Sequence, residues 1–442
     1  MNPKIAEHQA NICAKLIQEI DRLVVEEHRP ADQYLRHVYR QHPEYGSRDR
    51  NFYSDAVFSW FRWRGWLKTP GKENIALAIL MDALEIQPQV EYLLEGSGLP
   101  MTDIKPAGAM ETEEKSEYLR GILQTPQRSE AATFSTCSRG TPLPRSLNFN
   151  YNELLPSCFF DLVFVTEHKE RDAHLKQCIE TFQTRPPTWL RLPSGREEGT
   201  LKILLKAGYE IGQHLLIKQA VFVKGAKKFD ATQFPAIAVQ DLASQCVGLC
   251  CNPKAEESWW DMCAGSGGKS LHLADLTHDQ GSILATDVRT AILDQLSKRL
   301  QKNKYRFIKP LLWDGKSDPC PGKNFDGILI DAPCSGIGTW HRNPDARWRM
   351  DSGQIAQYAG VQKNLLETAA PKLKTDGRLV YSTCTLTRME NIDLISGFLE
   401  QHHEFRLEKL INPFNHEPSN GIIWIWPWEG CNGMFVAVMR KG

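Results

Sequence analysis

The C-terminal half of the chain alternates between short apolar runs and longer segments with helical periodicity, and this alternation limits the possible folds more than any other feature. Strand-length apolar runs lie at residues 258–262, 282–286, 307–312, 325–330 and 378–383. Helices are expected between and after them, at 268–276, 290–302, 351–373 and 389–401. A repeated strand–helix order predicts an α/β domain built on a parallel, doubly wound sheet.

Polar residues follow several of these predicted strands. Asp287, Asp314, Asp331 and Cys384 each stand at the carboxyl end of a different strand. Ligands of doubly wound sheets bind at that edge, so these four side chains are expected to border one site. Taken alone, two of them have simpler interpretations, since Asp287 can cap a helix and Asp314 can belong to a turn.

A glycine-rich stretch at residues 261–270 follows the first of these strands and opens a helix. Glycine permits close backbone approach, and a helix N-terminus favours an anionic group such as a carboxylate. The phosphate loop and the dinucleotide fingerprint both fail, because Cys263 and Ser270 stand where those patterns need glycine. The stretch therefore predicts a nucleoside ligand without a pyrophosphate, with Asp287 at its ribose hydroxyls and Asp314 beside its adenine.

Two cysteines stand at strand ends in the same domain. One closes the Asp-Ala-Pro-Cys run 331–334, and the other closes the Tyr-Ser-Thr-Cys run 381–384. Their separation of 50 residues accommodates one long helix between two parallel strands. A lone cysteine is most often inert packing, as we expect for Cys263 and Cys320. Two thiols at strand ends beside a carboxylate instead indicate the centre of an active site.

The overall composition is that of a soluble globular protein. The chain has 442 residues, 41% of them hydrophobic and 24% charged, with a formal net charge of zero. That length predicts two or three domains, and that charge argues against coating nucleic acid by bulk charge while leaving room for a local basic patch. No apolar run of about 18 residues exists, and the N-terminus is polar, so we expect neither a membrane span nor a signal peptide. Twelve scattered cysteines without zinc-site spacing predict reduced thiols, a cytoplasmic location and no metal.

The sequence before residue 246 predicts three further regions. Apolar residues at helical spacing indicate an all-α N-terminal domain, and a stretch rich in proline, serine and threonine indicates a linker with one short helix. A mixed pattern of strands and helices then predicts a small α+β unit. The expected divisions are 1–100 for the helical domain, 101–155 for the linker, 156–245 for the small unit and 246–442 for the α/β domain.

Residues 29–68 are locally basic and rich in aromatic side chains. They contain eight Lys or Arg against four Asp or Glu, and Trp60, Trp63 and Trp66 are interleaved among them. Basic residues with aromatic neighbours are typical of an RNA surface. They are equally typical of core aromatics beneath a solvated cationic face, so both interpretations stay open.

These motifs resemble those of the RNA 5-methylcytosine methyltransferase family, which includes bacterial ribosomal RNA small subunit methyltransferase B and the Nop2/Sun proteins. The family's Asp-Ala-Pro-Cys-Ser-Gly is intact at 331–336, and its Ser/Thr-Cys-Ser/Thr motif matches 382–385. Its Cys-Ala-Ala-Pro-Gly-Gly-Lys-Thr loop matches 263–270, with Gly-Ser in place of Ala-Pro. The resemblance covers roughly residues 155–440, and residues 46–50 resemble the start of a NusB-like helical domain. Shorter family elements recur at Arg342-Asn343-Pro344, Glu390-Asn391 and Gly433-Met434-Phe435.

The resemblance implies a Rossmann-like methyltransferase domain that uses S-adenosylmethionine to methylate cytosine C5 in RNA, most simply ribosomal RNA. Cys384 matches the nucleophile that adds to cytosine C6, and Cys334 matches the residue needed for release. Asp331 is expected to hydrogen-bond the cytosine edge while bordering the cofactor, and Lys269 to orient Asp331 or lower a thiol pKa. The cofactor-binding residues implied are Cys263, Ala264, Gly265, Ser266, Gly267, Gly268, Lys269, Asp287, Asp314 and Asp331.

Three alternatives remain open at this point. The substrate can be a transfer RNA, or the protein can be a non-catalytic assembly factor that binds RNA and keeps the fold. A DNA cytosine-C5 enzyme fits less well, because that family uses the Pro-Cys thiol as its nucleophile. For RNA contacts, the basic candidates are Arg191, Lys224, Lys227 and Lys228 in the small α+β unit.

Overall fold

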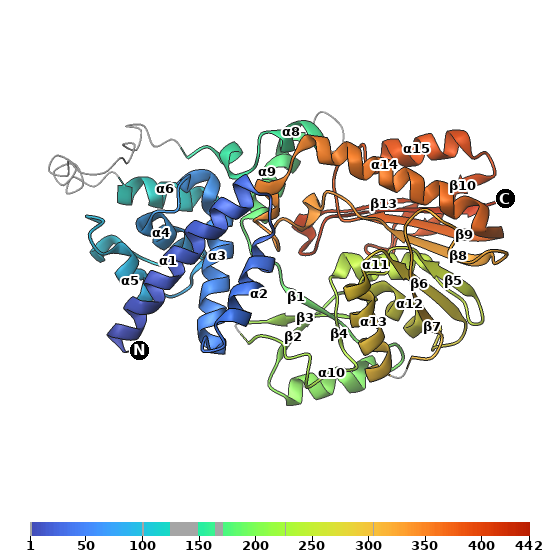
Figure 1. Ribbon diagram of the computed structural model, residues 1–442, viewed down its shortest axis with the longest axis horizontal. Helices are drawn as coiled ribbons and strands as arrows, with labels where there is room; N and C mark the ends of the chain where they lie inside the picture. The colour runs from blue at the N-terminus through green and yellow to red at the C-terminus, as the bar shows by residue number, and fades with distance from the viewer. Residues whose placement is uncertain (1, 100, 124–148, 164–170, 226, 304) are drawn as a thin grey trace. The chain divides into compact units, whose positions relative to one another are not determined.

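The computed structural model describes residues 2–99, 101–123, 149–163, 171–225, 227–303 and 305–442. The chain forms two compact units (Figure 1). The first comprises residues 1–161, 165–185 and 340–350, and the second comprises 162–164, 186–339 and 351–442. The four regions expected from the sequence remain a prediction, and their bounds do not coincide with those of the two units. The predicted linker lies partly outside the described residues, over 124–148.

The first unit is helical throughout its described part. Asn2 caps its first helix by accepting from the Lys4 N–H, and Pro3 occupies the first helical position, where its missing N–H costs nothing. Its α-helices are α1 (Pro3–Glu26), α2 (Ala31–Gln41), α3 (Ser47–Leu67), α4 (Lys72–Asp82), α5 (Pro88–Leu94), α6 (Thr112–Leu123), α8 (Cys158–Leu162) and α9 (Arg171–Phe182). Short 3₁₀ turns are η1 (Met101–Asp103), η2 (Tyr151–Leu154) and η4 (Ala346–Arg349).

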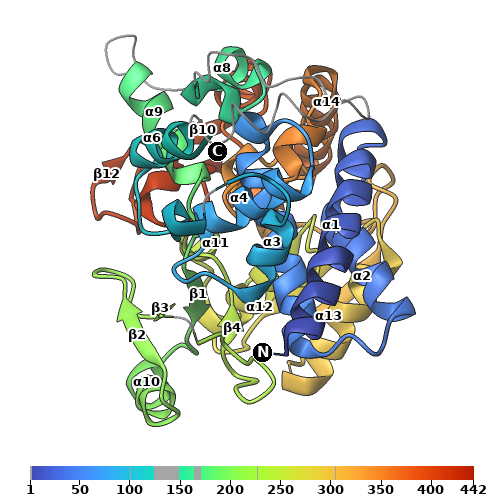
Figure 2. The same ribbon diagram turned by 90° about the vertical axis from the view of Figure 1, so that its left-hand side faces the viewer.

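Helix α3 lies at the centre of this unit and packs against α1 and α4 (Figure 2). Its aromatic residues Trp60, Phe61 and Trp63 are fully buried. Two of its arginines form salt bridges inside the helical unit: Arg62 pairs with buried Asp82, and Arg64 pairs with Asp21. Core packing therefore explains the aromatic residues of this basic stretch, and these two arginines are not part of an RNA surface.

One segment of the helical unit comes from far along the chain, at residues 340–350. Its Arg347 is completely buried and donates to the carbonyl oxygens of Leu154 and Phe182, at 3.1 and 2.8 Å. Trp348 Nε1 donates to the Phe61 carbonyl oxygen at 2.7 Å. The Arg-Asn-Pro element at 342–344 therefore belongs to a segment that completes the core of the helical unit.

The second unit is built on an eight-stranded sheet with the order β10-β14-β9-β8-β5-β6-β7, and β13 pairs with the same edge of β14 as β10 does. Strands β9, β8, β5, β6 and β7 are parallel to one another, which confirms the predicted doubly wound sheet. The strands are β5 (Ser258–Asp261), β6 (Ser282–Asp287), β7 (Ile308–Leu312), β8 (Phe325–Asp331), β9 (Leu373–Thr383), β10 (Phe405–Leu407), β13 (Ile422–Ile425) and β14 (Met434–Lys441).

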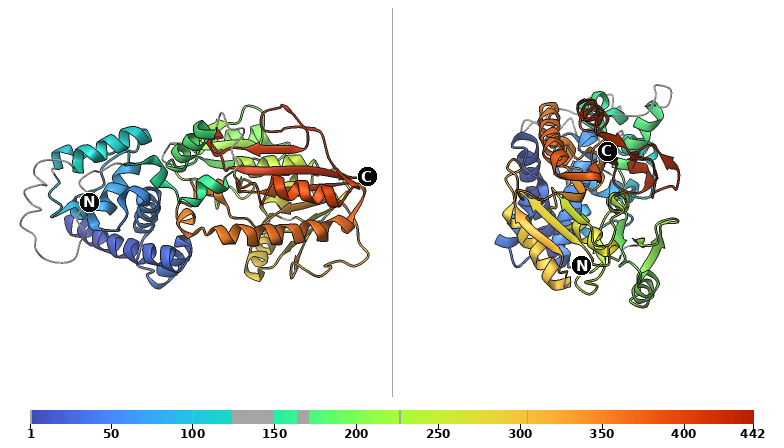
Figure 3. Two further views of the ribbon diagram at one scale, coloured as in Figure 1. Left: turned by 90° about the horizontal axis from the view of Figure 1, so that it is seen from above. Right: turned by 90° about the vertical axis from the view of Figure 1, so that its right-hand side faces the viewer.

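Helices cover both faces of this sheet (Figure 3). One core contains residues of α11, α12 and α13, and the other contains residues of α14 and α15. Helix α14 joins β8 to parallel β9, as the spacing of the two cysteines predicts. The bounds are α11 (Leu242–Cys251), α12 (Gly268–Leu276), α13 (Thr290–Asn303), α14 (Ser352–Ala369) and α15 (Ile392–Gln401), with 3₁₀ turns η3 (Ile337–Thr339), η5 (Ala370–Lys372) and η6 (Pro427–Glu429).

The antiparallel strands β10, β13 and β14 at one side of the sheet were not predicted. Strand β14 is buried between β9 on one side and β10 and β13 on the other, so its run Met434–Met439 is apolar on both faces. A continuous apolar run does not distinguish a buried strand from a buried helix. The direction of β14 follows from its short connection to β13, which only an antiparallel pair permits.

A smaller antiparallel sheet with the order β2-β3-β1-β4 belongs to the same unit, with α10 beside β2 (Figure 2). Leu190, Leu204 and Val221 form its core between sheet and helix. Its elements are β1 (Thr188–Arg191), α10 (Glu197–Lys206), β2 (Glu210–Gln213), β3 (Ala220–Lys224) and β4 (Ala238–Val239), and a separate pair is β11 (Leu410–Ile411) with β12 (Pro418–Ser419). This sheet and helix α10 match the α+β pattern predicted for the small unit.

Candidate functional site

The two motif cysteines lie side by side. The Cys334 and Cys384 sulfur atoms are 3.4 Å apart. Strands β8 and β9 are parallel neighbours with Asp331 opposite Ser382, so the loops that follow them leave the sheet at the same edge. The Gly338 N–H then donates to the Cys384 carbonyl oxygen at 3.0 Å, which fixes the two loops together. Sheet pairing therefore unites two residues that are 50 positions apart.

The two thiols are not equivalent. The hydrogen bond to Cys384, followed by burial and the nearby charge of Glu390, raises the pKa of Cys334 well above its ordinary value. With its pKa raised, the Cys334 thiol stays protonated, and the geometry of the contact allows either sulfur atom to donate to the other. The thiolate is the nucleophilic form of cysteine, so a raised pKa lowers the reactivity of the Cys334 sulfur.

Asp331 stands beside the sulfur pair at the end of β8. Its Oδ2 accepts from Lys269 Nζ at 2.6 Å, and its Oδ1 accepts from Ser382 Oγ at 3.0 Å. Burial alone would lower the pKa of Lys269, but the charge and hydrogen bond of Asp331 outweigh it and raise that pKa. The Asp331 side chain keeps 30% of its surface exposed, so it remains open to a ligand while Lys269 orients it.

The loop between β5 and α12 has the backbone that its glycines allow. Gly265 and Gly267 adopt positive φ angles of 56° and 86°. A Cβ at Gly267 would lie 2.3 Å from a Leu296 methyl carbon, so both strain and space require glycine there. The Gly265 N–H donates to Asp287 Oδ2 at 3.0 Å, and the Ala264 N–H donates to the Thr286 carbonyl oxygen at 2.8 Å. The predicted ligand loop is thus fastened to the end of β6.

Asp287 is the last residue of β6 and is buried. Its Oδ1 accepts from the backbone N–H and Nε of Arg289, each at 2.9 Å, and its Oδ2 accepts from Arg289 Nη2 at 2.9 Å. Burial would raise the pKa of Asp287, but the hydrogen bonds from Arg289 and Gly265 lower it below its ordinary value. The carboxylate is therefore held ionised at the edge of the glycine loop.

Asp314 lies two residues beyond β7 and is exposed. Its Oδ1 accepts from the Lys316 N–H at 2.8 Å and from the Ser317 N–H and Oγ at 2.8 and 2.9 Å. These bonds lower the pKa of Asp314 and match the turn interpretation. It also lines a hollow of about 630 Å³ at the ends of β6 and β7, together with Val288, Leu311, Leu312, Trp313, Ser317 and Pro319.

Three buried polar residues beside the site were not among its predicted members. Asp261 ends β5 and accepts from Ser270 Oγ at 2.6 Å, and its burial raises its pKa to about 7. Asn391 accepts from Thr383 Oγ1 at 2.6 Å, next to Cys384. Glu390 accepts from the Ser335 N–H at 2.8 Å, next to Cys334. Glu390 and Asn391 could have been found from the Glu-Asn element of the family motif. That element gives the residue types but not the contacts they make.

Burial separates the remaining predicted residues, two cysteines and the basic candidates for RNA contact, into buried and exposed side chains. Cys263 and Cys320 are not part of the sulfur pair, and burial raises the pKa of each. Arg191 does not serve as a contact for RNA, because only 5% of its side chain is exposed and it pairs with Asp275 at 2.6 Å. Lys227 Nζ donates to the Ala207 carbonyl oxygen, whereas Lys224, at the end of β3, is exposed, with its Nζ 5.8 Å from the centre of the Phe222 ring.

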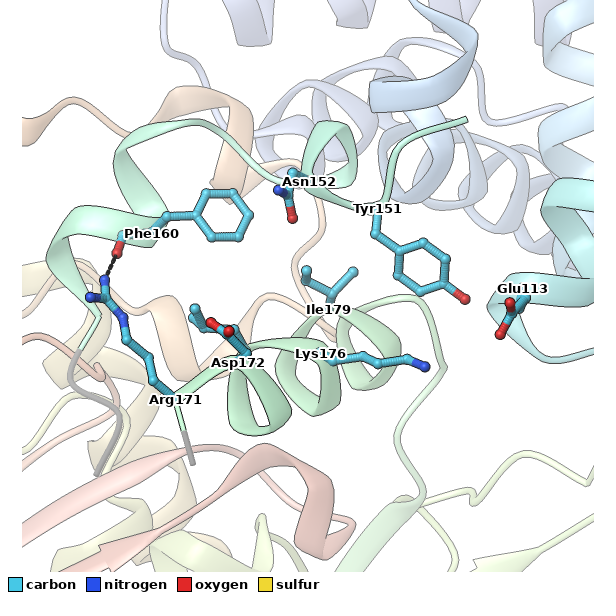
Figure 4. A pocket seen from close by; sticks show the side chains of 9 residues that line it. Glu113, Tyr151, Asn152, Phe160, Arg171, Asp172, Lys176 and Ile179 are labelled. Atoms are coloured by element: carbon cyan, nitrogen blue, oxygen red, sulfur yellow. Dashed lines mark hydrogen bonds between the residues drawn. The ribbon is translucent and has the colours of Figure 1, made fainter. Parts of the chain in front are cut away.

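A second hollow, of about 620 Å³, lies in the helical unit and contains none of the motif residues (Figure 4). Helix α9 contributes several of its side chains, and Arg171 Nη2 donates to the Phe160 carbonyl oxygen at 2.6 Å. Its two acidic and two basic residues balance in charge, so it has no preference for an anion. Its lining residues are Glu113, Tyr151, Asn152, Phe160, Arg171, Asp172, Leu175, Lys176 and Ile179.

No helix in the described residues is both long and apolar enough to cross a membrane. Within the same part of the chain, no group of three or more His, Cys, Asp or Glu side chains is arranged to hold a metal ion.

Comparisons with known proteins agree with this geometry. Residues 249–440 match the family model described as 16S rRNA methyltransferase RsmB/F. A probable ribosomal RNA small subunit methyltransferase B of Synechocystis is 38% identical over 49% of this chain and 51% of its own length, and one of Bacillus subtilis is 33% identical over 46% and 48%. The chain thus spans about half the length of these curated relatives. The ribosomal RNA small subunit methyltransferase B of Serratia proteamaculans is 29% identical over 69% of both chains.

Solved structures extend the likeness in fold to nearly the whole chain. The crystal structure of PH0851 matches with a TM-score of 0.71 over 97% of this chain and 99% of its own, at 22% identity. A methyltransferase homologue from Pyrococcus horikoshii matches with a TM-score of 0.53 over 60% of this chain and 90% of its own, at 27% identity.

Proposed function

Because the chain belongs to the RsmB/F family of methyltransferases, whose methyl donor is S-adenosylmethionine, we propose that it methylates cytosine C5 in RNA. The substrate we infer is ribosomal RNA, and the reaction proceeds through a transient bond between Cys384 and cytosine C6. The observation that carries the proposal is the 3.4 Å separation of the Cys334 and Cys384 sulfur atoms beside Asp331. A single buried thiol would not support it, but a protonated and a nucleophilic sulfur in contact meet the needs of addition and release.

The residues around the glycine loop fit the methyl donor. The position where a Cβ would stand on Gly265 has no atom within 4 Å, so this part of the loop is open to a ligand. Asp287 is an ionised acceptor for hydroxyl groups, and the exposed side chains of Val288 and Leu312 offer apolar contact to a base. When bound, S-adenosylmethionine supplies an electrophilic methyl group. Residues 263–269, Asp287 and the hollow at Asp314 would hold it.

Cys384 carries the first step that we propose. Cytosine C5 is a poor nucleophile in the intact aromatic ring. When the Cys384 thiolate adds to C6, C5 becomes enamine-like and nucleophilic. The positive charge of Lys269 interacts with Cys384 at this step.

Asp331 and Cys334 serve the later steps of the proposal. The partly exposed carboxyl group of Asp331 hydrogen-bonds the N3 and N4 edge of cytosine and holds the ring in place. After methylation the C5 proton passes to a water molecule, the C5–H bonding electrons form the C5–C6 double bond, and the C6–sulfur bond breaks with its electron pair staying on the Cys384 sulfur. The Cys334 thiol, already in contact with the Cys384 sulfur, donates a hydrogen bond to the departing thiolate.

The target cytosine has to leave its base stack to reach these sulfurs, which costs a few kcal/mol. Contacts to the RNA backbone offset that cost, and Lys224 is an exposed basic residue of the small sheet that can supply one. Binding of this kind weakens as salt concentration rises.

The experiment that tests the proposal combines adduct trapping with mapping of the product. Purified protein is incubated with S-adenosylmethionine and RNA that contains 5-fluorocytosine, and a covalent complex is expected on a denaturing gel. Bisulfite sequencing of cellular ribosomal and transfer RNA, with and without the protein, then locates the cytosine. Protection confined to transfer RNA would reassign the substrate, and RNA binding without methyl transfer would indicate an assembly factor.

A further inference from the structure

A buried carboxylate stands behind the sulfur pair. Glu390 lies between β9 and α15, six residues after Cys384, and has no exposed surface. Its Oε1 accepts from the Ser335 N–H at 2.8 Å and from Gln362 Nε2 at 3.2 Å. Its Oε2 accepts from Ser335 Oγ at 2.5 Å and Thr387 Oγ1 at 2.8 Å. All four donors are uncharged, and no ion pair with Glu390 occurs among the described side chains.

These contacts hold the backbone on both sides of Cys334. Ser335 follows Cys334 directly and gives Glu390 both its N–H and its hydroxyl. Gln362 Nε2, the same nitrogen that reaches Glu390, also donates to the carbonyl oxygen of Pro333 at 2.9 Å, which precedes Cys334. Glu390 therefore fixes the loop that carries one sulfur, from within the segment that follows the other.

The same network reaches the second loop. Thr385, next to Cys384, has its Oγ1 2.6 Å from Ser335 Oγ. Glu390 Oε2 also accepts directly from Thr387 Oγ1, three residues after Cys384, so removing the carboxylate would loosen both cysteine loops. The Cys334 loop gives it two bonds, both from Ser335.

Hydrogen bonding alone does not explain a carboxylate at this position. Burying an ionised group away from water is costly unless an opposite charge or hydrogen bonds compensate it. A carboxylate kept at such a cost suggests that its charge has a function. The charged or titratable groups around the two sulfurs are Glu390, Lys269, Asp331 and Tyr381. The negative charge of Glu390 acts on Cys334, and the positive charge of Lys269 acts on Cys384. The two chemically identical thiols therefore have different charged neighbours, Glu390 at Cys334 and the Lys269–Asp331 pair at Cys384.

We propose that Glu390 is a positioning residue that holds the Cys334 loop and, opposed by Lys269 at the other sulfur, makes Cys334 the thiol and Cys384 the nucleophile. The consequence for catalysis rests on the proposed function, whereas the asymmetry itself belongs to the free protein. Glu390 contacts no reacting atom and acts through Ser335 and through its charge.

The direct test measures each thiol in the full chain without RNA. Wild-type protein and Glu390→Gln are treated with iodoacetamide over a range of pH, and mass spectrometry follows the Cys334 and Cys384 peptides separately. In the wild type, Cys384 is expected to react faster. In Glu390→Gln the rate at Cys334 is expected to rise about threefold or more near pH 8, because the loss of the neighbouring charge lowers its pKa.

Matched variants separate charge from packing. Asp393→Asn makes the same chemical change three residues away on an exposed side chain and should leave both rates unchanged. Glu390→Asp keeps the charge and should keep Cys334 slow. Lys269→Met should slow Cys384 without accelerating Cys334, and it tests the opposing charge even where Glu390→Gln does not fold. Equal acceleration of both cysteines, or the same rates in Glu390→Gln and Glu390→Asp, would overturn the inference.

A second readout links the asymmetry to turnover. With RNA, Glu390→Gln is expected to lower kcat about tenfold with little change in KM, and to accumulate the covalent adduct. If wild-type protein forms no adduct but Glu390 still controls the alkylation ratio, the proposed function fails and this inference stands. If wild-type protein methylates RNA and Glu390→Gln leaves both the alkylation ratio and release unchanged, only this inference fails.

Discussion

The polar residues at the ends of the parallel strands are of two kinds. At the middle of the sheet, after β8 and β9, Asp331, Cys334 and Cys384 contact one another or residues of a neighbouring strand or loop. At the edge strand β7, Asp314 accepts hydrogen bonds only from its own turn, through Lys316 and Ser317, among the bonds of the described residues. The sequence pattern that marks them is the same, yet their surroundings differ.

The difference follows from the position of each strand in the sheet. A strand in the middle has a neighbour on each side, so a polar group at its carboxyl end meets the loops of two other strands. A strand at the edge has one neighbour, and a side chain beyond its end is satisfied locally or by solvent. Under the proposed function, the bond-making chemistry therefore lies at the β8 and β9 ends, and the β7 end offers at most a contact to the cofactor.

The largest effect is expected for Cys384→Ala. Removing the sulfur that adds to C6 should abolish adduct formation with 5-fluorocytosine RNA and lower the methylation rate by about 1,000-fold or more. Gel retention of labelled RNA and transfer of a labelled methyl group measure the two effects. Cys320→Ala is the control, since that thiol is not part of the pair. A trapped adduct in Cys384→Ala would mean that the two cysteines have exchanged roles.

The second effect concerns the neighbouring sulfur. Cys334→Ala should still allow addition to C6 but slow release, because no thiol donates to the departing Cys384 sulfur. Multiple turnover is expected to fall about 100-fold, while an adduct accumulates with RNA containing ordinary cytosine. A denaturing gel measures this directly. If Cys334→Ala retained no RNA, a role in release would be excluded.

The third effect tests the carboxylate between the cofactor loop and the sulfurs. Asp331→Asn removes the counter-ion of Lys269 and weakens the orientation of the bound base, so kcat should fall about 30-fold, the effect of losing one hydrogen bond to a charged group. Single-turnover methylation rates measure it. Asp326→Asn is a matched control, because Asp326 stands near the start of the same strand, β8, and pairs with Lys374. Equal losses in the two variants would indicate general destabilisation of β8.

The parallel sheet and the cysteine pair could be predicted from the sequence, and the features that could not be predicted have a common physical cause. Alternation of strands and helices predicted the parallel part of the sheet, because buried parallel strands are nearly continuous apolar runs. The cysteines could be predicted as a pair from the family motif, and their contact follows once β8 and β9 are neighbours. The burial of Arg191 and the contacts of Glu390 with Ser335 and Gln362 could not be predicted, since they depend on residues distant in sequence that only the folded chain brings together.

The fourth effect lies at β6, the strand next to the edge. Asp287→Asn replaces an ionised acceptor with an amide and loses the ion pair with Arg289. The affinity for S-adenosylhomocysteine should fall about tenfold, as is typical when one hydrogen bond to a charged group is lost. Titration calorimetry measures the Kd, and thermal unfolding without ligand reports any structural change. An unchanged Kd would mean that Asp287 serves only to fasten Gly265 and Arg289.

The smallest effect is expected at β7. Asp314→Ala removes three hydrogen bonds from an exposed turn, and groups of that kind contribute little because water replaces the lost partners. Methylation rate and the Kd for S-adenosylhomocysteine should each change by less than about twofold. Ser317→Ala provides the matched control, because it deletes one of the same turn bonds without altering charge. If Asp314→Ala weakened the ligand as much as Asp287→Asn while Ser317→Ala did not, Asp314 would contact the adenine. In that case both middle and edge strands would contribute to cofactor binding, and only the bond-making residues would be confined to the middle strands.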